Sequence, residues 1–241
     1  MNMWPFKRRN RAGEDTPYCA AVIVAAGRAT RMDGIDKAIA PLGLEPVIVH
    51  AVRPFQRSRR VQEIVVVTRE DLLVPIGQAL QDAGMDKVTM VVVGGASRAE
   101  SVIIGLDTVS KKTRLVAVHD GARPLVTGQI VDAAIQKAAE TGAAAPAIPV
   151  KDTIKIAKDG LVECTPNRAS LFAVQTPQVF DRDLLRGALQ KARQDGAEVT
   201  DDCMACERIG MKVHLVAGSE ENLKITTPMD LVLADEILAG R

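Results

Sequence analysis

The stretch CAAVIVAAGRATRM, residues 19–32, joins a run of small and β-branched apolar residues to a basic loop. The apolar run shows no alternation, which is typical of a strand covered on both faces of a parallel sheet. The run ends at Ala26-Gly27, and Arg28 and Arg31 follow within five positions. This order places backbone N–H groups and positive charge at one edge of a sheet. The loop is therefore either a solvated basic loop or a binding site for a polyphosphate.

The same kind of apolar run recurs along the chain and alternates with helical patterns. We expect strands at residues 20–25, 63–68, 89–93, 115–119 and 144–150, and helices at 46–56, 72–83, 98–109 and 127–141. Such alternation predicts βαβ units that build a Rossmann-like α/β fold, with a mostly parallel twisted sheet flanked by helices. In such a sheet, ligands bind outside the carboxyl ends of the strands.

Composition limits the classes of function. The chain has 241 residues, of which 47% are hydrophobic, and this is enough for one domain, expected at residues 18–241. A net charge of +1 gives no general attraction to nucleic acid or to an anionic membrane. No apolar run approaches the roughly 18–20 residues of a membrane span. Four scattered cysteines make no disulfide framework, so we expect a cytoplasmic protein, with residues 1–17 as a flexible basic tail.

The region from about 150 to 170 breaks the alternation of strands and helices. DTIKIA (152–157) and LVECTP (161–166) are short alternating segments, and Asp159-Gly160 lies between them as a strong turn signal. We expect a β-hairpin arm that protrudes from the main sheet. Because an isolated hairpin is marginal in water, the arm should pack on something else, such as a second subunit.

Two later strands end in residues that can bind a ligand. Gly94-Gly95 either lets a flat ligand approach the backbone closely or simply makes the turn into the next helix. The following strand ends at His119-Asp120, with Arg123 close behind. Asp120 could hold Mg²⁺ together with substrate phosphates, or it could form a local ion pair with Arg123. We interpret His119 as a buried core histidine.

Features near the carboxyl end are more local. Cys203 and Cys206 have the spacing of a metal or redox pair, but no second cysteine pair completes a zinc set, so we predict that they pack a helix beginning near Asp201. Lys224 falls in an expected short strand. Thr227, followed by a proline and an acid, predicts the start of a final helix.

Seven motifs follow one another in register from about Ala20 to the final helix. They are AAG-x-x-x-RM, GG-x-x-R-x-x-SV, VHD-x-ARP, PV-x-DT-x-K, R-x-x-L-x-x-x-QTPQ-x-F, TDD and NLKITTPMDL. Together they resemble the 2-C-methyl-D-erythritol 4-phosphate cytidylyltransferase family of the non-mevalonate isoprenoid pathway. The resemblance implies a nucleotidyltransferase fold and a reaction in which CTP and methylerythritol phosphate give CDP-methylerythritol and pyrophosphate, with Mg²⁺ or another divalent cation.

The resemblance also implies roles for individual residues. The catalytic residues would be Arg31, Lys37 and Lys224; the CTP-binding residues would be Ala25, Ala26, Gly27, Gly94, Gly95, Ser101 and Asp120, with Asp120 also holding the metal; and the acceptor-binding residues would be Arg123, Thr153, Arg168 and Thr176. In the family the hairpin arm reaches into a partner subunit. A homodimer is therefore implied, in which Thr153 and Arg168 complete the neighbour's site.

Three positions depart from the family pattern. Ala29 replaces the second glycine of the loop, and Asp36-Lys37-Ala38 replaces the usual Pro-Lys-Gln. Ala29 restricts the loop, and Asp36 adds negative charge beside the proposed triphosphate lysine. Two other functions therefore stay open: a cytidylyltransferase for another polyol phosphate such as ribitol 5-phosphate, and a CTP-binding protein without turnover. A nucleic-acid-binding module is disfavoured by the charge and by the few aromatic residues.

Overall fold

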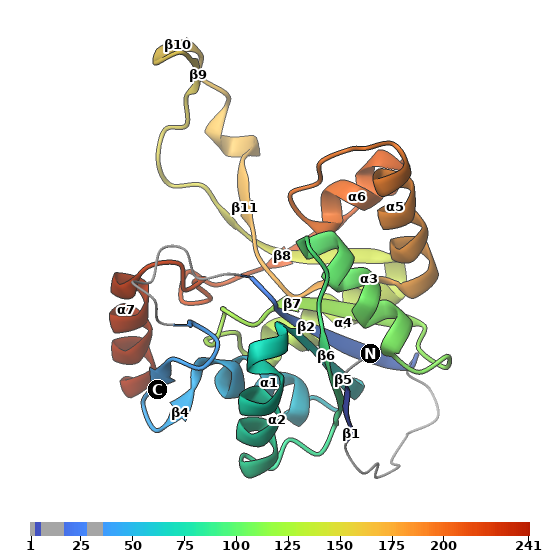
Figure 1. Ribbon diagram of the computed structural model, residues 1–241. Helices are drawn as coiled ribbons and strands as arrows, with labels where there is room; N and C mark the ends of the chain where they lie inside the picture. Colours follow the sequence, from blue (N-terminus) through green and yellow to red (C-terminus); the bar gives the residue numbers. More distant parts are fainter. Residues whose placement is uncertain (1–2, 6–16, 28–35) are drawn as a thin grey trace.

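A nine-stranded sheet forms the centre of the protein (Figure 1). The computed structural model describes residues 3–5, 17–27 and 36–241. The strands of this sheet are β1 (Met3–Pro5), β2 (Cys19–Ala25), β5 (Val61–Thr68), β6 (Val88–Val93), β7 (Leu115–Asp120), β8 (Ala143–Pro149), β11 (Phe172–Val174), β12 (Gln178–Asp181) and β13 (His214–Ala217). Their order is β1-β6-β5-β2-β7-β12-β8-β11, and β13 pairs with β8.

Four neighbouring strands, β6, β5, β2 and β7, are parallel, and β13 pairs with β8 in parallel. The antiparallel members are β12, between β7 and β8, and the edge strands β1 and β11. The predicted mostly parallel sheet is therefore confirmed, and each of the five expected strands is present with an end shifted by at most two residues.

Helices cover both faces of the sheet. They are α1 (Val47–Arg57), α2 (Leu73–Asp82), α3 (Arg98–Thr108), α4 (Gly128–Thr141), α5 (Arg182–Gln194), α6 (Asp202–Arg208) and α7 (Pro228–Ala239). The four expected helices correspond to α1–α4. Short elements complete the chain: β3 (Pro41–Leu42) paired with β4 (Glu45–Pro46), and the 3-10 turns η1 (Glu70–Leu72) and η2 (Arg168–Ser170).

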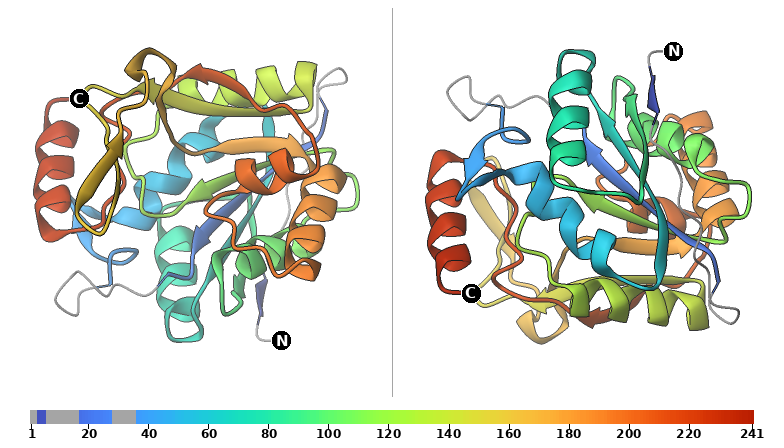
Figure 2. Two further views of the ribbon diagram at one scale, coloured as in Figure 1. Left: turned by 90° about the horizontal axis from the view of Figure 1, so that it is seen from above. Right: turned by 90° about the horizontal axis from the view of Figure 1, so that it is seen from below.

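The alternation of side chains along β2 divides the core between the two faces. Ala21 and Ile23 pack in the cluster that holds α1, α2 and α4, whereas Ala20 and Val22 pack in the cluster that holds α3, α5 and α6. Both clusters consist almost wholly of aliphatic side chains, as the low aromatic content requires. Helix α7 lies on the opposite side of the molecule from α5 and α6 (Figure 2) and belongs to a smaller third cluster.

Two expectations about irregular segments are corrected. Residues 3–5 of the expected flexible tail form β1, which pairs antiparallel with β6; residues 1–2 and 6–16 lie outside the described residues. Lys224 does not lie in a strand: its segment is extended but forms no ladder, and the backbone N–H of Ile225 donates to the Ala122 carbonyl. The final helix begins as predicted, with a capping box between Thr227 and Asp230.

The arm stands away from the body of the protein (Figure 1). Strands β9 (Ile156–Lys158) and β10 (Leu161–Cys164) pair antiparallel. The turn residues Asp159 and Gly160 have φ values of 51° and 80°, which matches the expected Asp-Gly turn. All residues of both strands are exposed. Among the described residues, no helix is both long and apolar enough to span a membrane.

The contact between α3 and β2 requires glycine at position 105. A Cβ atom there would lie 2.4 Å from Cγ1 of Val22. We expect Gly105→Ala to lower the free energy of unfolding by about 1–3 kcal/mol, because the helix must move off the sheet. A Cβ atom added to Gly187, in α5, would meet no atom within 4 Å, so Gly187→Ala should be neutral or stabilising by up to about 1 kcal/mol. Urea unfolding of both variants checks this, and an equal effect would contradict the packing argument.

Candidate functional site

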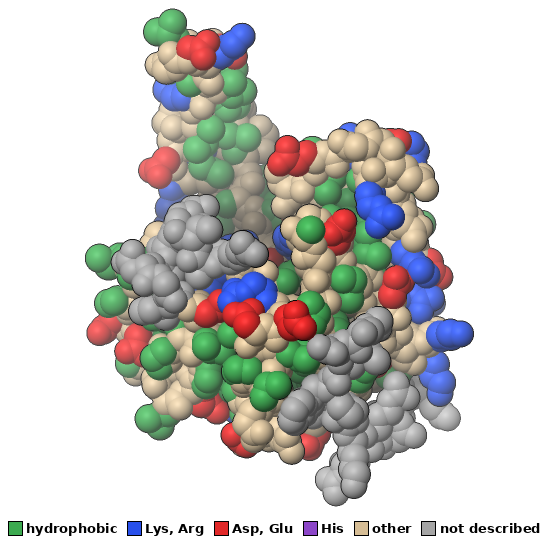
Figure 3. All heavy atoms as spheres, in the orientation of Figure 1, with side chains coloured by type: hydrophobic (Ala, Val, Ile, Leu, Met, Phe, Trp, Pro, Cys, Tyr) green, Lys and Arg blue, Asp and Glu red, His purple; other side chains and the backbone are tan. Residues whose placement is uncertain are grey.

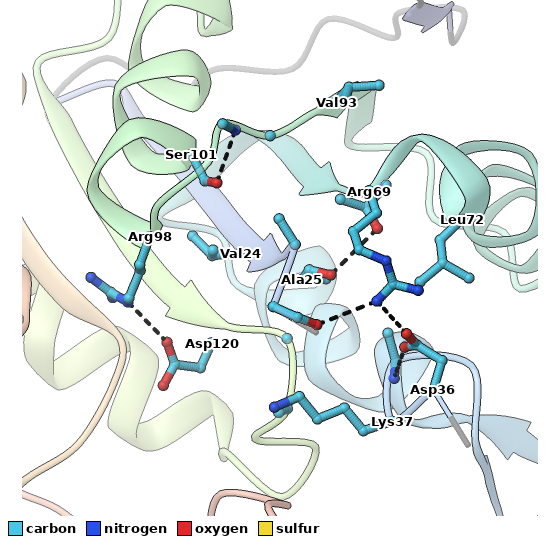
Figure 4. Close-up of a pocket in the computed structure, with 18 of the residues that line it drawn as sticks. Val24, Ala25, Asp36, Lys37, Arg69, Leu72, Val93, Arg98, Ser101 and Asp120 are labelled. Atoms are coloured by element: carbon cyan, nitrogen blue, oxygen red, sulfur yellow. Dashed lines mark hydrogen bonds and ion pairs between the residues drawn. The ribbon is translucent and has the colours of Figure 1, made fainter. Parts of the chain in front are cut away.

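A cavity of about 1180 Å³ lies at the carboxyl ends of β2, β5, β6 and β7 (Figure 4). Each strand contributes its last residues or the loop that follows it: Ala26-Gly27 after β2, Arg69 after β5, Gly94-Gly95 after β6 and Asp120 at the end of β7. This is the edge at which a parallel α/β sheet binds ligands. Nine of the sequence-predicted residues line the cavity: Ala25, Ala26, Gly27, Lys37, Gly94, Gly95, Ser101, Asp120 and Lys224.

The glycine pair brings bare backbone to one wall of the cavity. A Cβ on Gly94 would lie 2.7 Å from the Ser101 hydroxyl and 2.8 Å from the Ala26 methyl group. Ser101 Oγ accepts a hydrogen bond from the N–H of Gly95 at 3.2 Å and donates to the Ser97 carbonyl at 2.9 Å. Ser101 therefore fixes the loop after β6 to the start of α3. The resulting wall is uncharged and closely packed, which suits a flat ring better than a phosphate.

Asp120 is the centre of charge at the opposite wall. Lys224 Nζ lies 2.9 Å from its carboxylate, Arg98 Nε 3.5 Å and Arg123 Nε 3.7 Å. Burial raises the pKa of Asp120, but Lys224 and the two arginines outweigh burial and hold the pKa well below its usual range. Asp120 is therefore a carboxylate at any physiological pH. The local Asp120–Arg123 pair that the sequence suggested is present, but it is only one of three.

Arg98 is a site residue that sequence reasoning assigned no role. It lines the cavity, and Nη2 donates to Oδ2 of the fully buried Asp202 at 2.8 Å. Asp202 starts α6, and Gln178 of β12 accepts from the backbone N–H groups of Asp202 and Cys203. Arg98 thus links Asp120 to the N-terminus of α6. The GG-x-x-R motif contains Arg98 and could have pointed to it. The sequence could not show its partner, because Asp202 lies 104 positions away.

Thr176 and Arg123 lie behind Asp120 and are not part of the cavity wall. Thr176 Oγ1 accepts from the N–H of Asp120 at 3.1 Å and hydrogen-bonds Nδ1 of His119 at 2.9 Å. Arg123 Nη1 donates to the Asn222 carbonyl at 2.6 Å, which holds the segment that carries Lys224. His119 is fully buried, as expected of a core histidine, and burial lowers its pKa to about 4. These residues fix the end of β7.

The remaining predicted residues lie elsewhere. Arg31 falls within residues 28–35, outside the described residues. Thr153 and Arg168 are exposed residues of the arm and do not line the cavity of their own chain; Arg168 Nη1 donates to the Lys151 carbonyl at 2.6 Å. A site within one chain therefore contains the predicted nucleotide-binding residues but not the two arm residues.

Lys37 extends along the cavity toward the side on which Asp120 lies (Figure 4). Arg69, which sequence reasoning did not identify, lines the cavity beside it and pairs with Asp36 at 2.5 Å. Positive groups therefore come from three sides of the cavity: Lys37 before α1, Arg69 after β5, and Arg98 and Lys224 around Asp120. This distribution suits a ligand with several negative charges.

The cysteine pair takes no part in chemistry. Cys203 and Cys206 are buried in α6, as predicted, and burial raises the pKa of the Cys206 thiol to about 12. Both are therefore protonated thiols that pack the helix. In the part of the chain that the structure describes, no three His, Cys, Asp or Glu side chains form a metal-binding group. A divalent cation here would depend on the Asp120 carboxylate, with ligand oxygens and water completing the coordination, which is the arrangement Mg²⁺ favours.

Comparison with known proteins gives one consistent result. A family model described as 2-C-methyl-D-erythritol 4-phosphate cytidylyltransferase matches residues 19–240. Proteins with that name from Caldanaerobacter subterraneus subsp. tengcongensis and Symbiobacterium thermophilum are 44% and 45% identical to this chain; both alignments cover 91% of this chain, and they cover 98% and 92% of the relatives. The crystal structure of 4-diphosphocytidyl-2C-methyl-D-erythritol synthase from Anaerococcus prevotii superposes with a TM-score of 0.83 at 31% identity, covering 92% of this chain and 96% of the other.

Burial of His119 makes stability depend on pH. The pKa of His119 falls from 6.5 to about 4 in the folded protein. Between pH 6.5 and pH 4, His119 is therefore protonated in the unfolded chain but neutral in the native state. We expect the free energy of unfolding to fall as pH drops from 6.5 to 4, with His119 contributing about 3 kcal/mol of that loss. The contribution should be absent in His119→Gln and intact in His214→Gln, which alters an exposed histidine of β13. Parallel pH curves for wild type and His119→Gln, from chemical unfolding, would contradict this.

Proposed function

The chain belongs to the 2-C-methyl-D-erythritol 4-phosphate cytidylyltransferase family, and from this premise we propose how its residues carry out the reaction. The protein transfers the cytidylyl group of CTP to 2-C-methyl-D-erythritol 4-phosphate and releases pyrophosphate, in the non-mevalonate route to isoprenoid precursors. The observation that carries the proposal is the cavity itself. It combines an uncharged backbone wall at Gly94-Gly95 with cations on its other sides, as a nucleoside triphosphate requires.

The cytosine base would lie against the backbones of Ala26-Gly27 and Gly94-Gly95. The close packing of Gly94 on Ser101 and Ala26 leaves that wall without side chains and holds it rigid. Backbone N–H and C=O groups can then read the edge of the base. Ser101, which ties one loop to α3, keeps the wall in place.

The triphosphate would extend toward Lys37 and Lys224, and Arg31, which is outside the described residues, would add a third cation. In the reaction, a phosphate oxygen of the acceptor attacks the α-phosphorus of CTP in line, and the bond from that phosphorus to the pyrophosphate breaks. No covalent enzyme intermediate is needed. The work of the protein is to bring two anions together and to neutralise the charge that develops. Lys224, at 2.9 Å from Asp120, is held at the place where the α-phosphate would lie.

Asp120 is the residue that would hold Mg²⁺. Its low pKa keeps it ionised, and a single carboxylate together with phosphate oxygens is a common Mg²⁺ site. When bound, the cation supplies neutralisation of the triphosphate and favours departure of pyrophosphate. Arg98 and Arg123 keep the carboxylate oriented, and the N–H of Asp120 is fixed by the Thr176 hydroxyl.

The acceptor would bind beside Asp120, which Thr176 and Arg123 hold from behind, with Thr153 and Arg168 supplied by the arm of a partner subunit. The surface of the arm supports a homodimer. Figure 3 shows hydrophobic side chains along the arm, and the exposed ones are Ile154, Ile156, Leu161 and Val162; Phe172 and Val174, in the adjoining strand β11, are exposed as well. A single chain leaves this apolar surface in water, and docking onto a second copy would bury it.

The reaction can be tested by measuring pyrophosphate release from CTP and Mg²⁺. We expect release with 2-C-methyl-D-erythritol 4-phosphate and not with ribitol 5-phosphate. Lys224→Ala should lower kcat by at least about 100-fold, because it removes a charge that stabilises the transition state. Release with ribitol 5-phosphate alone would overturn the acceptor. If CTP binds but neither acceptor supports release, the chain is a CTP-binding protein without turnover.

Arg168 should act in the neighbour's site. We expect Arg168→Ala to raise the acceptor KM at least about tenfold while the CTP KM changes little, because a phosphate contact is worth about 1.5–3 kcal/mol. Lys158→Ala, which removes an exposed cation of β9 on the same arm, is the matched control.

A mixture of subunits tests whether this action is in trans. With the acceptor well below its wild-type KM, Arg168→Ala and Lys224→Ala subunits, co-refolded in equal amounts, should recover about a quarter of the wild-type activity, because half of the dimers then contain one intact site of two. A mixture that is no more active than its components, or a protein that sediments as a monomer at micromolar concentration, would contradict a shared site.

A further inference from the structure

We propose that Arg69 is a positioning residue for CTP, which acts by holding Gly27 and Asp36 and, through Asp36, the turn that carries Lys37. The inference deepens the proposed function and rests on it. It also accounts for Asp36, where the family pattern has proline and this chain brings a negative charge next to a lysine that would bind phosphate.

The guanidinium of Arg69 joins three segments, and Figure 4 shows its pair with Asp36. Nε and Nη2 donate to the two carboxylate oxygens of Asp71, in η1, at 3.0 and 2.8 Å. Nη1 donates to Oδ2 of Asp36 at 2.5 Å and to the carbonyl of Gly27 at 3.4 Å. Because Asp71 accepts from two nitrogens on one edge of the planar guanidinium, the orientation of the third nitrogen is fixed. Arg69 itself follows β5 directly, so the sheet determines where Asp36 and Gly27 are held.

Asp36 in turn fixes the backbone turn that contains Lys37. Its Oδ1 accepts from the N–H of Ala38 at 3.0 Å, and its carbonyl accepts from the N–H of Ala40 at 2.9 Å. These bonds close the turn that contains Lys37. At its other end the turn is anchored in the core, because Ala38 is buried and its carbonyl accepts from the N–H of Ile48 in α1. The backbone that carries Lys37 is therefore held by a core contact and by the Asp36–Arg69 pair.

The ion pair between Arg69 and Asp36 is suited to a permanent structural role. The side chains of Arg69 and Asp36 are only 22% and 13% exposed, so water screens their attraction weakly. The hydrogen bond with Asp71 is the largest influence on the pKa of Arg69 and, with Asp36, raises it above its usual value, so Arg69 stays charged. Arg69 thus compensates the charge of Asp36 at the point where a triphosphate must bind.

Steady-state kinetics with CTP and 2-C-methyl-D-erythritol 4-phosphate, together with calorimetric titration of CTP and Mg²⁺, tests the inference. We expect Arg69→Ala to raise the CTP KM and Kd on the order of tenfold, the cost of about one charged hydrogen bond, and to leave the acceptor KM unchanged. Arg69→Lys should not rescue binding, because an ammonium group cannot hold Asp71 through two nitrogens and also reach Asp36.

Arg182→Ala is the matched control. Arg182 is equally exposed, donates through Nε and Nη2 to the adjacent Asp183 and reaches the carbonyls of Ser110 and Lys111, but it lies at the amino end of β7, away from the cavity. This variant should keep the wild-type CTP KM. If Arg69→Ala and Arg182→Ala behave alike while the wild type turns over, Arg69 has no positioning role. If the wild type releases no pyrophosphate, the proposed function has failed instead.

A double-mutant cycle separates positioning from direct contact with the nucleotide. Asp36→Asn keeps an acceptor for the N–H of Ala38 but removes the charge that Arg69 binds. If Arg69 acts through Asp36, adding Arg69→Ala to this variant should raise the CTP Kd less than about threefold further. A full tenfold further loss would show that Arg69 binds CTP itself, and this outcome overturns the inference even if Arg69→Ala alone proves too unstable to purify.

Discussion

The buried carboxylate of Asp120 determines where the charged side chains of the site lie. Lys224, Arg98 and Arg123 come from three separate segments, and each has a charged nitrogen within 3.7 Å of it. A carboxylate at the edge of a core is costly unless it is paired, and three cations so close together would repel one another without it. The end of β7 therefore holds the first residue of α3 and the segment before α7 at the same place.

This constraint also prepares the cavity for an anion. The cations around Asp120 are oriented before any ligand arrives, so little reorganisation is needed when phosphate groups bind. The opposite wall is determined by close packing and not by charge. Gly94 packs so closely on Ser101 and Ala26 that no side chain fits at that position. A neutral, closely packed wall facing a charged one separates the place of a base from the place of its phosphates.

The sequence predicted most of the fold, because strands buried on both faces require continuous apolar runs, and β2, β5 and β7 have them. Most of the site residues that it predicted line the cavity, since loops that leave parallel strands meet at one edge. It did not predict Arg98 or Arg69, because an arginine that pairs with a residue 104 or 33 positions away leaves no local pattern. Lys224 was wrongly expected in a strand. Its segment is held instead by the Arg123 side chain, which donates to the Asn222 carbonyl, and by a backbone hydrogen bond from the N–H of Ile225 to the carbonyl of Ala122.

A structure of the protein with CTP and Mg²⁺ bound is the most direct test of the idea that this cavity is the nucleotide site. We expect the cytosine ring between Ala26-Gly27 and Gly94-Gly95, and Nζ of Lys37 and of Lys224 within about 4 Å of phosphate oxygens, the range of an ion pair. Lys224 should then have exchanged some of its contact with Asp120 for the α-phosphate. A nucleotide bound outside the cavity, or inside it with its phosphates against the Gly94-Gly95 wall, would contradict this idea.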